Sequence, residues 1–171
     1  MTAYNATTDQ NECLFCAIIA GHISTPGRFW ENDEFAAWLA IDPNTPGFTV
    51  VVPKSHQPSD VLALPDDLLQ RFVIAAKQVS QILLQHYPDC GRVGLIMEGT
   101  GINHAHIKLV PMHGTPFLKD GQWQQVLSEG EVWSENYTGF ITSAGGPMAD
   151  SDDLATLAAK LSAISESGQA V

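Results

Sequence analysis

The sequence contains little positive charge and no long hydrophobic run. Among its 171 residues, 8 lysines and arginines stand against 19 acidic residues, for a formal net charge of −11. Because nucleic-acid polymers and anionic membranes are bound through excess positive charge, we expect neither as a partner. No stretch reaches the roughly 18 consecutive apolar residues of a membrane-spanning helix. A small phosphate ester is compatible with this composition, since it needs only a few local cations and backbone N–H groups.

The first residues do not resemble a secretion signal, and cysteines are few. Residues 1–12 are polar and contain no lysine or arginine, so the charged start and apolar centre of such a signal are missing. We therefore expect a cytoplasmic protein with a flexible N-terminus.

Three cysteines are too few, and of the wrong parity, for a disulfide framework. Cys13 and Cys16 form a Cys-x-x-Cys pair, for which metal binding and simple burial are both open readings.

The strand signals predict an antiparallel sheet. Residues 28–31 and 35–39 flank the turn signal Asn32-Asp33 and are typical of a hairpin. Residues 47–52 form a β-branched run that ends at Pro53 and predict a central strand. Two more strands are predicted at residues 93–97 and 105–110.

The helix signals complete an α+β fold, in which we expect the helices on one face of the sheet. Residues 13–20 are apolar and long enough for about two helical turns. After Pro65, apolar residues recur at three- and four-residue spacing until Pro88, which predicts one long helix. A further amphipathic helix is predicted from about Asp150 to residue 164.

These elements suggest one main domain with a C-terminal extension. We place the domain at residues 13–116 and the extension at residues 117–165, with a flexible tail at residues 166–171. The extension contains enough aromatic residues to pack on the domain: Trp123, Trp133, Tyr137 and Phe140.

The segment with the clearest chemistry is Asn-His-Ala-His-Ile-Lys-Leu-Val-Pro at residues 103–111. Side chains alternate across a strand, so His104, His106 and Lys108 are predicted on one face and apolar residues on the other. Three basic groups in a row would repel one another unless an anion lies across them. Two other readings stay open from the residues alone, an exposed strand face and a zinc site formed by His104 and His106.

Several segments together resemble the histidine triad (HIT) family of nucleotide hydrolases and transferases. In order along the chain they are Cys13-Leu-Phe-Cys16, residues 35–42, Gly-Phe-Thr-Val-Val-Val-Pro-Lys-Ser-His at 47–56, a long helix and His-Ala-His-Ile-Lys-Leu-Val-Pro at 104–111. The resemblance covers residues 13–113. It implies a HIT-like sheet with a short N-terminal helix and one long helix.

The resemblance also implies roles for particular residues. His106 is the middle residue of the family motif and would be the nucleophile, with His104 as the first histidine. Asp42 would hold the ribose hydroxyls, although a turn residue before Pro43 is an equal reading. The glycine-rich stretch Gly99-Thr100-Gly101 would approach the phosphate. The implied reaction forms a nucleotidyl-histidine intermediate from a dinucleoside polyphosphate or a nucleoside phosphoramidate. The resemblance also implies that the protein is a homodimer.

The sequence departs from the family motif at two positions. The third motif histidine is replaced by Lys108, an ammonium that can bind phosphate oxygens but cannot easily shuttle a proton. Thr100 stands where many relatives carry glutamine. These departures leave a second interpretation open, a weakly active or non-catalytic purine-nucleotide-binding protein.

Finally, the resemblance implies a metal site. Some members hold a structural zinc with residues that match Cys13, Cys16, His56 and His104, and two thiolates with two imidazoles suit tetrahedral zinc. The ion would be structural, and no cofactor would be required for the chemistry. The alternative is that both cysteines are small buried hydrophobic residues.

Overall fold

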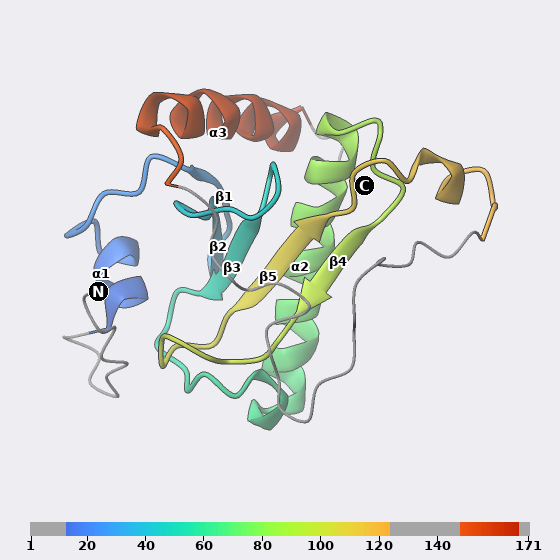
Figure 1. The fold of residues 1–171 in the computed structure, drawn as a ribbon. Coiled ribbons are helices and arrows are strands. Elements are labelled where there is room, and N and C mark those ends of the chain that lie inside the picture. Colours follow the sequence, from blue (N-terminus) through green and yellow to red (C-terminus); the bar gives the residue numbers. More distant parts are fainter. Residues whose placement is uncertain (1–12, 124–147, 168–171) are drawn as a thin grey trace, which may run out of the picture.

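The computed structural model describes residues 13–123 and 148–167 (Figure 1). The predictions for the N-terminus, for Trp133, Tyr137 and Phe140, and for residues 168–171 of the tail lie outside the described residues. Within the described part, no helix is both long and apolar enough to span a membrane.

The predicted antiparallel sheet is confirmed and has five strands in the order β1-β2-β3-β5-β4. Their bounds are β1 Arg28–Glu31, β2 Phe35–Leu39, β3 Thr49–Pro53, β4 Val93–Ile96 and β5 Ile107–Pro111. The predicted hairpin is formed by β1 and β2, and its turn is fixed by Asn32, whose side-chain oxygen accepts hydrogen bonds from the backbone N–H groups of Glu34 and Phe35. Such side-chain mimicry of a turn is the reason asparagine favours these positions.

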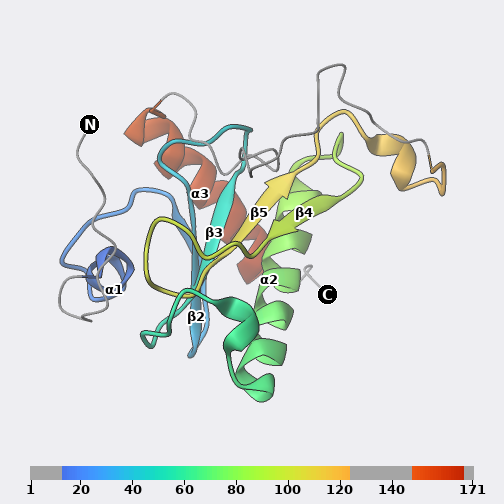
Figure 2. The same ribbon diagram turned by 60° about the horizontal axis from the view of Figure 1, so that its bottom comes forward.

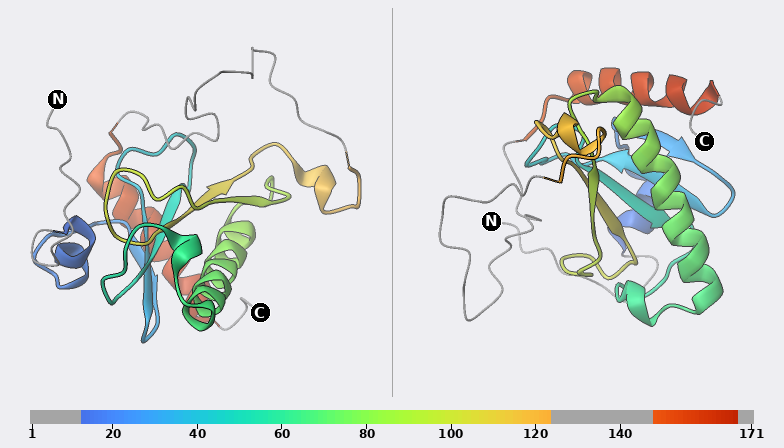
Figure 3. Two further views of the ribbon diagram at one scale, coloured as in Figure 1. Left: turned by 90° about the horizontal axis from the view of Figure 1, so that it is seen from below. Right: turned by 90° about the vertical axis from the view of Figure 1, so that its right-hand side faces the viewer.

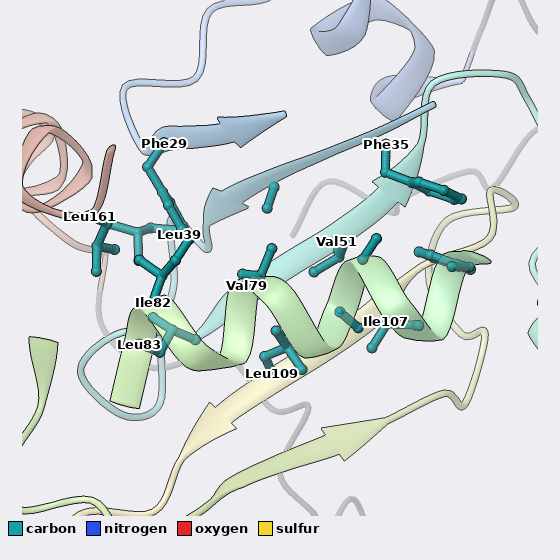
Figure 4. Close-up of a cluster of buried hydrophobic side chains, with 14 of the residues drawn as sticks. Phe29, Phe35, Leu39, Val51, Val79, Ile82, Leu83, Ile107, Leu109 and Leu161 are labelled. Carbon is teal, nitrogen blue, oxygen red and sulfur yellow. The ribbon is translucent and has the colours of Figure 1, made fainter. Parts of the chain in front are cut away.

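The long helix α2 (Asp66–His86) covers one face of the sheet. Its buried side chains meet inward-facing residues of β2, β3 and β5, among them Leu39, Val51 and Ile107, in the main core (Figure 4). The helix begins after Pro65, with Asp66 and Asp67 in its first turn, where the helix dipole favours negative charge.

The C-terminal helix α3 (Ser151–Glu166) packs on β1 and α2 (Figure 3). Its N-terminus is capped by Asp150, whose carboxylate accepts hydrogen bonds from the backbone of Asp152 and Asp153. Leu161 is fully buried in the main core, and the Ser162 hydroxyl donates to the Phe29 carbonyl at 2.7 Å. This part of the extension is therefore joined to the same core as the sheet.

The short helix α1 (Leu14–Ile19) lies on the opposite face of the sheet from α2 (Figure 2). Its Phe15 and Ile18 pack against Trp38 and Val50, which alternate along β2 and β3 with the residues that face α2. The prediction that all helices share one face is wrong for this helix. Two 3₁₀ turns, η1 (Val61–Ala63) and η2 (Pro116–Leu118), complete the described elements.

Strand β5 begins at Ile107, two residues later than the predicted strand at 105–110. Its partner β3 ends at Pro53, which has no backbone N–H to donate to a ladder. Ala105 instead donates its N–H to the carbonyl of Gln57, in the loop after β3, at 2.9 Å. His104 and His106 therefore lie in the segment that leads into the strand.

Candidate functional site

His106 is held in one orientation at the entrance to β5. Its Nδ1 lies 2.7 Å from the backbone carbonyl of His104. A carbonyl oxygen only accepts, so Nδ1 must carry the hydrogen and Nε2 the lone pair. Burial lowers the pKa of His106, and the positive charge of Lys108 lowers it further. The hydrogen bond to the His104 carbonyl acts in the opposite direction, but the net shift is downward. The result is a neutral imidazole with a fixed tautomer.

His106 also lines a cavity of about 460 Å³ on the face of the sheet that carries α1. Most of the wall is apolar, and Phe15 stands edge-on to the His106 ring with 5.6 Å between ring centroids. The wall residues of this kind are Leu14, Phe15, Ile18, Ile23, Trp38, Ala40, Ile41, Phe48, Val50 and Ile102. A mostly apolar cavity with a few converging polar groups is the usual form of a small-molecule site.

Lys108 lines the same cavity and forms an ion pair with Glu98. Both side chains are largely shielded from solvent, at 14% and 15% exposure. Burial by itself raises the pKa of Glu98, but the hydrogen bond and charge of Lys108, helped by Thr100 and His106, outweigh it, and the net shift is downward. Glu98 is thus an anion, and the ammonium of Lys108 is already partly neutralised before any ligand binds.

The glycine-rich stretch forms the loop between β4 and β5. Gly99 has a φ of +64°, and a Cβ there would lie 2.5 Å from the Ser59 carbonyl oxygen, so only glycine fits. Thr100 and Gly101 line the cavity, whereas Gly99 does not. The Thr100 hydroxyl donates to Glu98 at 3.1 Å. Two of the three predicted phosphate-loop residues therefore line the same cavity as Lys108 and His106.

Asp42 stands at the rim of the cavity. It follows β2 in the segment that leads to β3, is exposed, and is one of the lining residues. The structure thus brings Asp42, Thr100, Gly101, His106 and Lys108 together around one cavity. The turn before Pro43 therefore lies at the cavity rim, and the role of Asp42 toward a ribose stays a prediction.

His104 does not face that cavity. Its side chain is fully buried, and Nε2 lies 2.9 Å from the carbonyl of Pro53. Its Nδ1 lies 3.4 Å from Cys13 Sγ and 3.5 Å from Cys16 Sγ. The predicted row of three basic groups facing one anion is therefore reduced to His106 and Lys108, with His104 turned toward the cysteines.

The four predicted metal ligands converge. Donor atoms of Cys13, Cys16, His56 and His104 all lie within 4.8 Å of one another, with Cys16 Sγ 3.4 Å from His56 Nδ1. Around a tetrahedral zinc, with Zn–S of about 2.3 Å and Zn–N of about 2.0 Å, neighbouring ligand atoms are roughly 3.3–3.8 Å apart. Burial holds the pKa of His104 at about 4, so the ring is neutral, as a metal ligand must be. The donor set fits zinc.

Sequence reasoning missed several residues of the site. The sequence does not mark Glu98 as a site residue, because its pairing with Lys108 depends on the register of β4 against β5. In that register, Ile96 lies opposite Lys108. Trp38 could have been found by alternation along β2, since Ala37 and Leu39 face the α2 core and Trp38 points the other way. Thr25 also lines the cavity, and its buried hydroxyl has no hydrogen-bond partner among the described residues.

The chain matches one protein-family model and is similar to proteins from several organisms. The model of the HIT domain matches residues 25–115. An uncharacterized HIT-like protein of Methanocaldococcus jannaschii is 32% identical over 106 residues, which cover 59% of this chain and 79% of that protein.

Solved structures of similar fold extend over more of the chain. A Zn-bound histidine triad family protein from Mycobacterium smegmatis has a TM-score of 0.63 and 19% identity, and the match covers 93% of this chain and 99% of that one. A hypothetical histidine triad nucleotide-binding protein from Sulfolobus tokodaii has a TM-score of 0.61 and 22% identity, with 87% and 88% covered. At these identities the likeness establishes the fold.

Proposed function

The chain belongs to the HIT domain family, whose members are generally nucleotide hydrolases or transferases, and we propose that it is one of these, with His106 as the nucleophile. The observation that supports this best is the His106 ring, whose Nδ1 is fixed on a backbone carbonyl while the ring lines a cavity shared with Lys108. The nucleotide-binding description of the Sulfolobus tokodaii protein agrees with a nucleotide in that cavity.

The reaction we infer has two displacements at phosphorus. His106 Nε2 attacks the α-phosphorus, the bond to the leaving group breaks, and a nucleotidyl-histidine forms. Water then attacks the same phosphorus, the phosphorus–nitrogen bond breaks, and the nucleoside monophosphate leaves with His106 restored. The substrate is a dinucleoside polyphosphate or a nucleoside phosphoramidate. Lys108 and the backbone N–H groups around Gly101 would hold the phosphate oxygens, Asp42 the ribose hydroxyls, and Phe15, Ile18 and Ile41 the base.

The test of this proposal is His106→Asn. Removing the nucleophile should reduce turnover of a fluorogenic adenosine phosphoramidate and of diadenosine tetraphosphate by roughly 10³-fold or more, while AMP still binds in calorimetry. His22→Asn, the same change at an exposed position, should leave turnover unchanged. Wild-type turnover in the His106 variant would show that another group attacks phosphorus.

A second candidate, a weakly active or non-catalytic nucleotide-binding protein, is favoured by the Lys108–Glu98 ion pair. A lysine paired with a carboxylate cannot easily pass a proton to a leaving group, as a neutral histidine can. If the wild-type protein binds AMP but forms no product from either substrate in a single-turnover mixture, this candidate replaces the first.

We also propose that Cys13, Cys16, His56 and His104 hold a structural zinc that ties α1 to the sheet. Support comes from the distances within the cluster, and from the His104 Nε2–H, which donates to the Pro53 carbonyl and leaves the Nδ1 lone pair toward the thiols. The same geometry disfavours a zinc hydrolase with His104 and His106 as joint ligands, because both ring nitrogens of His104 are engaged away from His106, by the Pro53 carbonyl and by the two cysteines.

Removal of this ion should lower the melting temperature, since metal binding to a folded site is folding free energy. Exhaustive chelation followed by a thermal melt measures the effect, and re-addition of zinc should reverse it. An unchanged melting temperature together with no bound metal would contradict the site. Turnover lost instantly on chelation, before any unfolding, would point to a catalytic ion instead.

A further inference from the structure

A second group of metal-ligating side chains lies at the end of β5 away from His106. Asp89 and Cys90 lie in the turn between α2 and β4, and His113 lies in the turn after β5. Pairing of β4 with β5, with Val93 opposite Pro111, brings the two turns together. One donor atom from each of the three side chains lies within 4.8 Å of the other two.

The orientation of the His113 ring suggests that a cation belongs in this group. Its Nε2 lies 3.0 Å from the backbone carbonyl of Pro46, and since that oxygen only accepts, Nε2 carries the hydrogen. In the neutral ring, Nδ1 then carries a lone pair, and it lies 2.9 Å from Asp89 Oδ2. A carboxylate oxygen also only accepts. Two acceptors at this distance require a positive charge between them, either a proton or a metal ion.

The third donor favours the metal ion. Cys90 Sγ lies 3.4 Å from His113 Nδ1, close to the roughly 3.5 Å that separates a sulfur and a nitrogen ligand around one tetrahedral zinc. The nitrogen–oxygen pair must open by a few tenths of an ångström, to reach the roughly 3.3 Å of zinc ligands. Cys90 Sγ lies 4.0 Å from Asp89 Oδ1, so the thiolate and the carboxylate must approach each other by about half an ångström to share one ion. The Pro46 carbonyl already orients the imidazole, as an outer hydrogen bond commonly does for a ligating histidine.

The two turns are held rigidly enough to present the ligands. Thr115 N donates to the Asp89 carbonyl at 3.0 Å, and Gly91 N donates to the Thr115 hydroxyl at 3.1 Å. The turns approach so closely that a Cβ on Gly91 would lie 2.1 Å from the Thr115 carbonyl oxygen. Little rearrangement is therefore needed when a ligand binds.

We propose that Asp89, Cys90 and His113 form a second zinc site, separate from the Cys13 cluster and from the nucleotide cavity. One thiolate, one carboxylate and one neutral imidazole balance the charge of a zinc ion, and a mixed nitrogen, oxygen and sulfur set suits it. The Asp89 side chain is 50% exposed, so the ion has a route from solvent and a position for water as the fourth ligand. The alternative is an imidazolium–carboxylate ion pair, which makes no use of Cys90.

The three cysteines of the chain allow a direct test. In a Cys13→Ser/Cys16→Ser variant, Cys90 is the only thiol, so any thiolate-to-cobalt charge-transfer band must come from it. Titration with Co²⁺ should give this band with one equivalent bound, and adding Cys90→Ser should abolish it. Asp89→Asn and His113→Asn should each weaken Co²⁺ binding by at least roughly tenfold, whereas Asp120→Asn, at a nearby exposed carboxylate, should not.

A second measurement protects the test against a double variant that does not fold. Zinc bound per chain, measured by mass spectrometry after dialysis, should fall by one equivalent from the otherwise native protein to its His113→Asn variant. Equal zinc content in these two proteins, or a titration without a charge-transfer band in the folded double variant, would overturn the proposal and leave the ion pair as the explanation.

Discussion

At the scale of single residues, a backbone carbonyl sets the chemistry of His106. The 2.7 Å contact to the His104 carbonyl fixes the orientation of the ring and its tautomer. In many enzymes a carboxylate has this role. A second interaction at this scale is the ion pair between Lys108 and Glu98. Because the ammonium is shared between Glu98 and any bound phosphate, the carboxylate should limit how tightly the cavity holds an anion.

Glu98→Gln should therefore increase the affinity for AMP. The substitution removes a negative charge beside the expected phosphate position and leaves Lys108 fully available. We expect the affinity for AMP to rise roughly fivefold, which corresponds to about 1 kcal/mol of Coulomb energy between charges that are largely shielded from solvent. Calorimetry at fixed ionic strength measures this affinity. Glu34→Gln, which removes an exposed partner of Arg71, is the matched control and should have no effect. Unchanged or weaker binding in the Glu98 variant would show that phosphate does not lie next to this pair.

At the scale of elements, helix α3 belongs to the core although it follows the HIT-like region in sequence. Leu161 is buried between α3, β1 and α2, beside Phe29 and Leu39. The helix should therefore contribute to the stability of the whole sheet.

Leu161→Ala should lower the free energy of unfolding by about 2–5 kcal/mol, because it removes buried methyl groups and leaves a cavity. Leu62→Ala is the same chemical change at a side chain that is 73% exposed, and should cost under about 0.5 kcal/mol. Urea unfolding followed by circular dichroism measures both. Equal, small effects would mean that α3 is attached to the domain only loosely.

The elements also show which parts of the fold the sequence can predict. The spacing from Leu68 to Leu83 predicted α2, and the turn signal at Asn32 predicted the β1–β2 hairpin, because local patterns determine both. The face that α1 covers could not be predicted, since its apolar run has no polar side to orient it. The start of β5 was also missed, because it depends on where β3 ends. At the site, chain order and motif suggested His106 and the grouping of His104 with Cys13 and Cys16. The pairing of Glu98 with Lys108 could not be predicted, because it depends on tertiary contacts.

At the scale of the whole molecule, β4 forms one edge of the sheet. Leu95 on this strand is 43% exposed, and no described strand pairs with the outer edge of β4. An open edge with an apolar side chain is a ready surface for a second chain. We propose that it forms the homodimer that the family resemblance implies, through the sheet edge and the long helix.

Leu95→Lys should convert such a dimer to a monomer of 18.5 kDa, since each copy would bury a lysine opposite its partner. Sedimentation at micromolar concentration would show the halved mass. Met148→Lys places the same charge on a 72% exposed side chain just before α3, which packs on β1 at the other edge of the sheet, and should leave the mass unchanged. A wild-type protein that already sediments as a monomer would rule out the proposed association.

Helix α1 connects the Cys13 cluster to the cavity that His106 lines. Its six residues are too few to stay helical in water without tertiary support. Cys16 faces the cluster with His56 and His104, while Phe15 and Ile18 form part of the nucleotide cavity. If zinc fastens one side of this helix, it also fixes the wall against which a base would lie. Thermodynamic linkage then works in both directions. If bound zinc raises the affinity for the nucleotide by some factor, the bound nucleotide raises the affinity for zinc by the same factor.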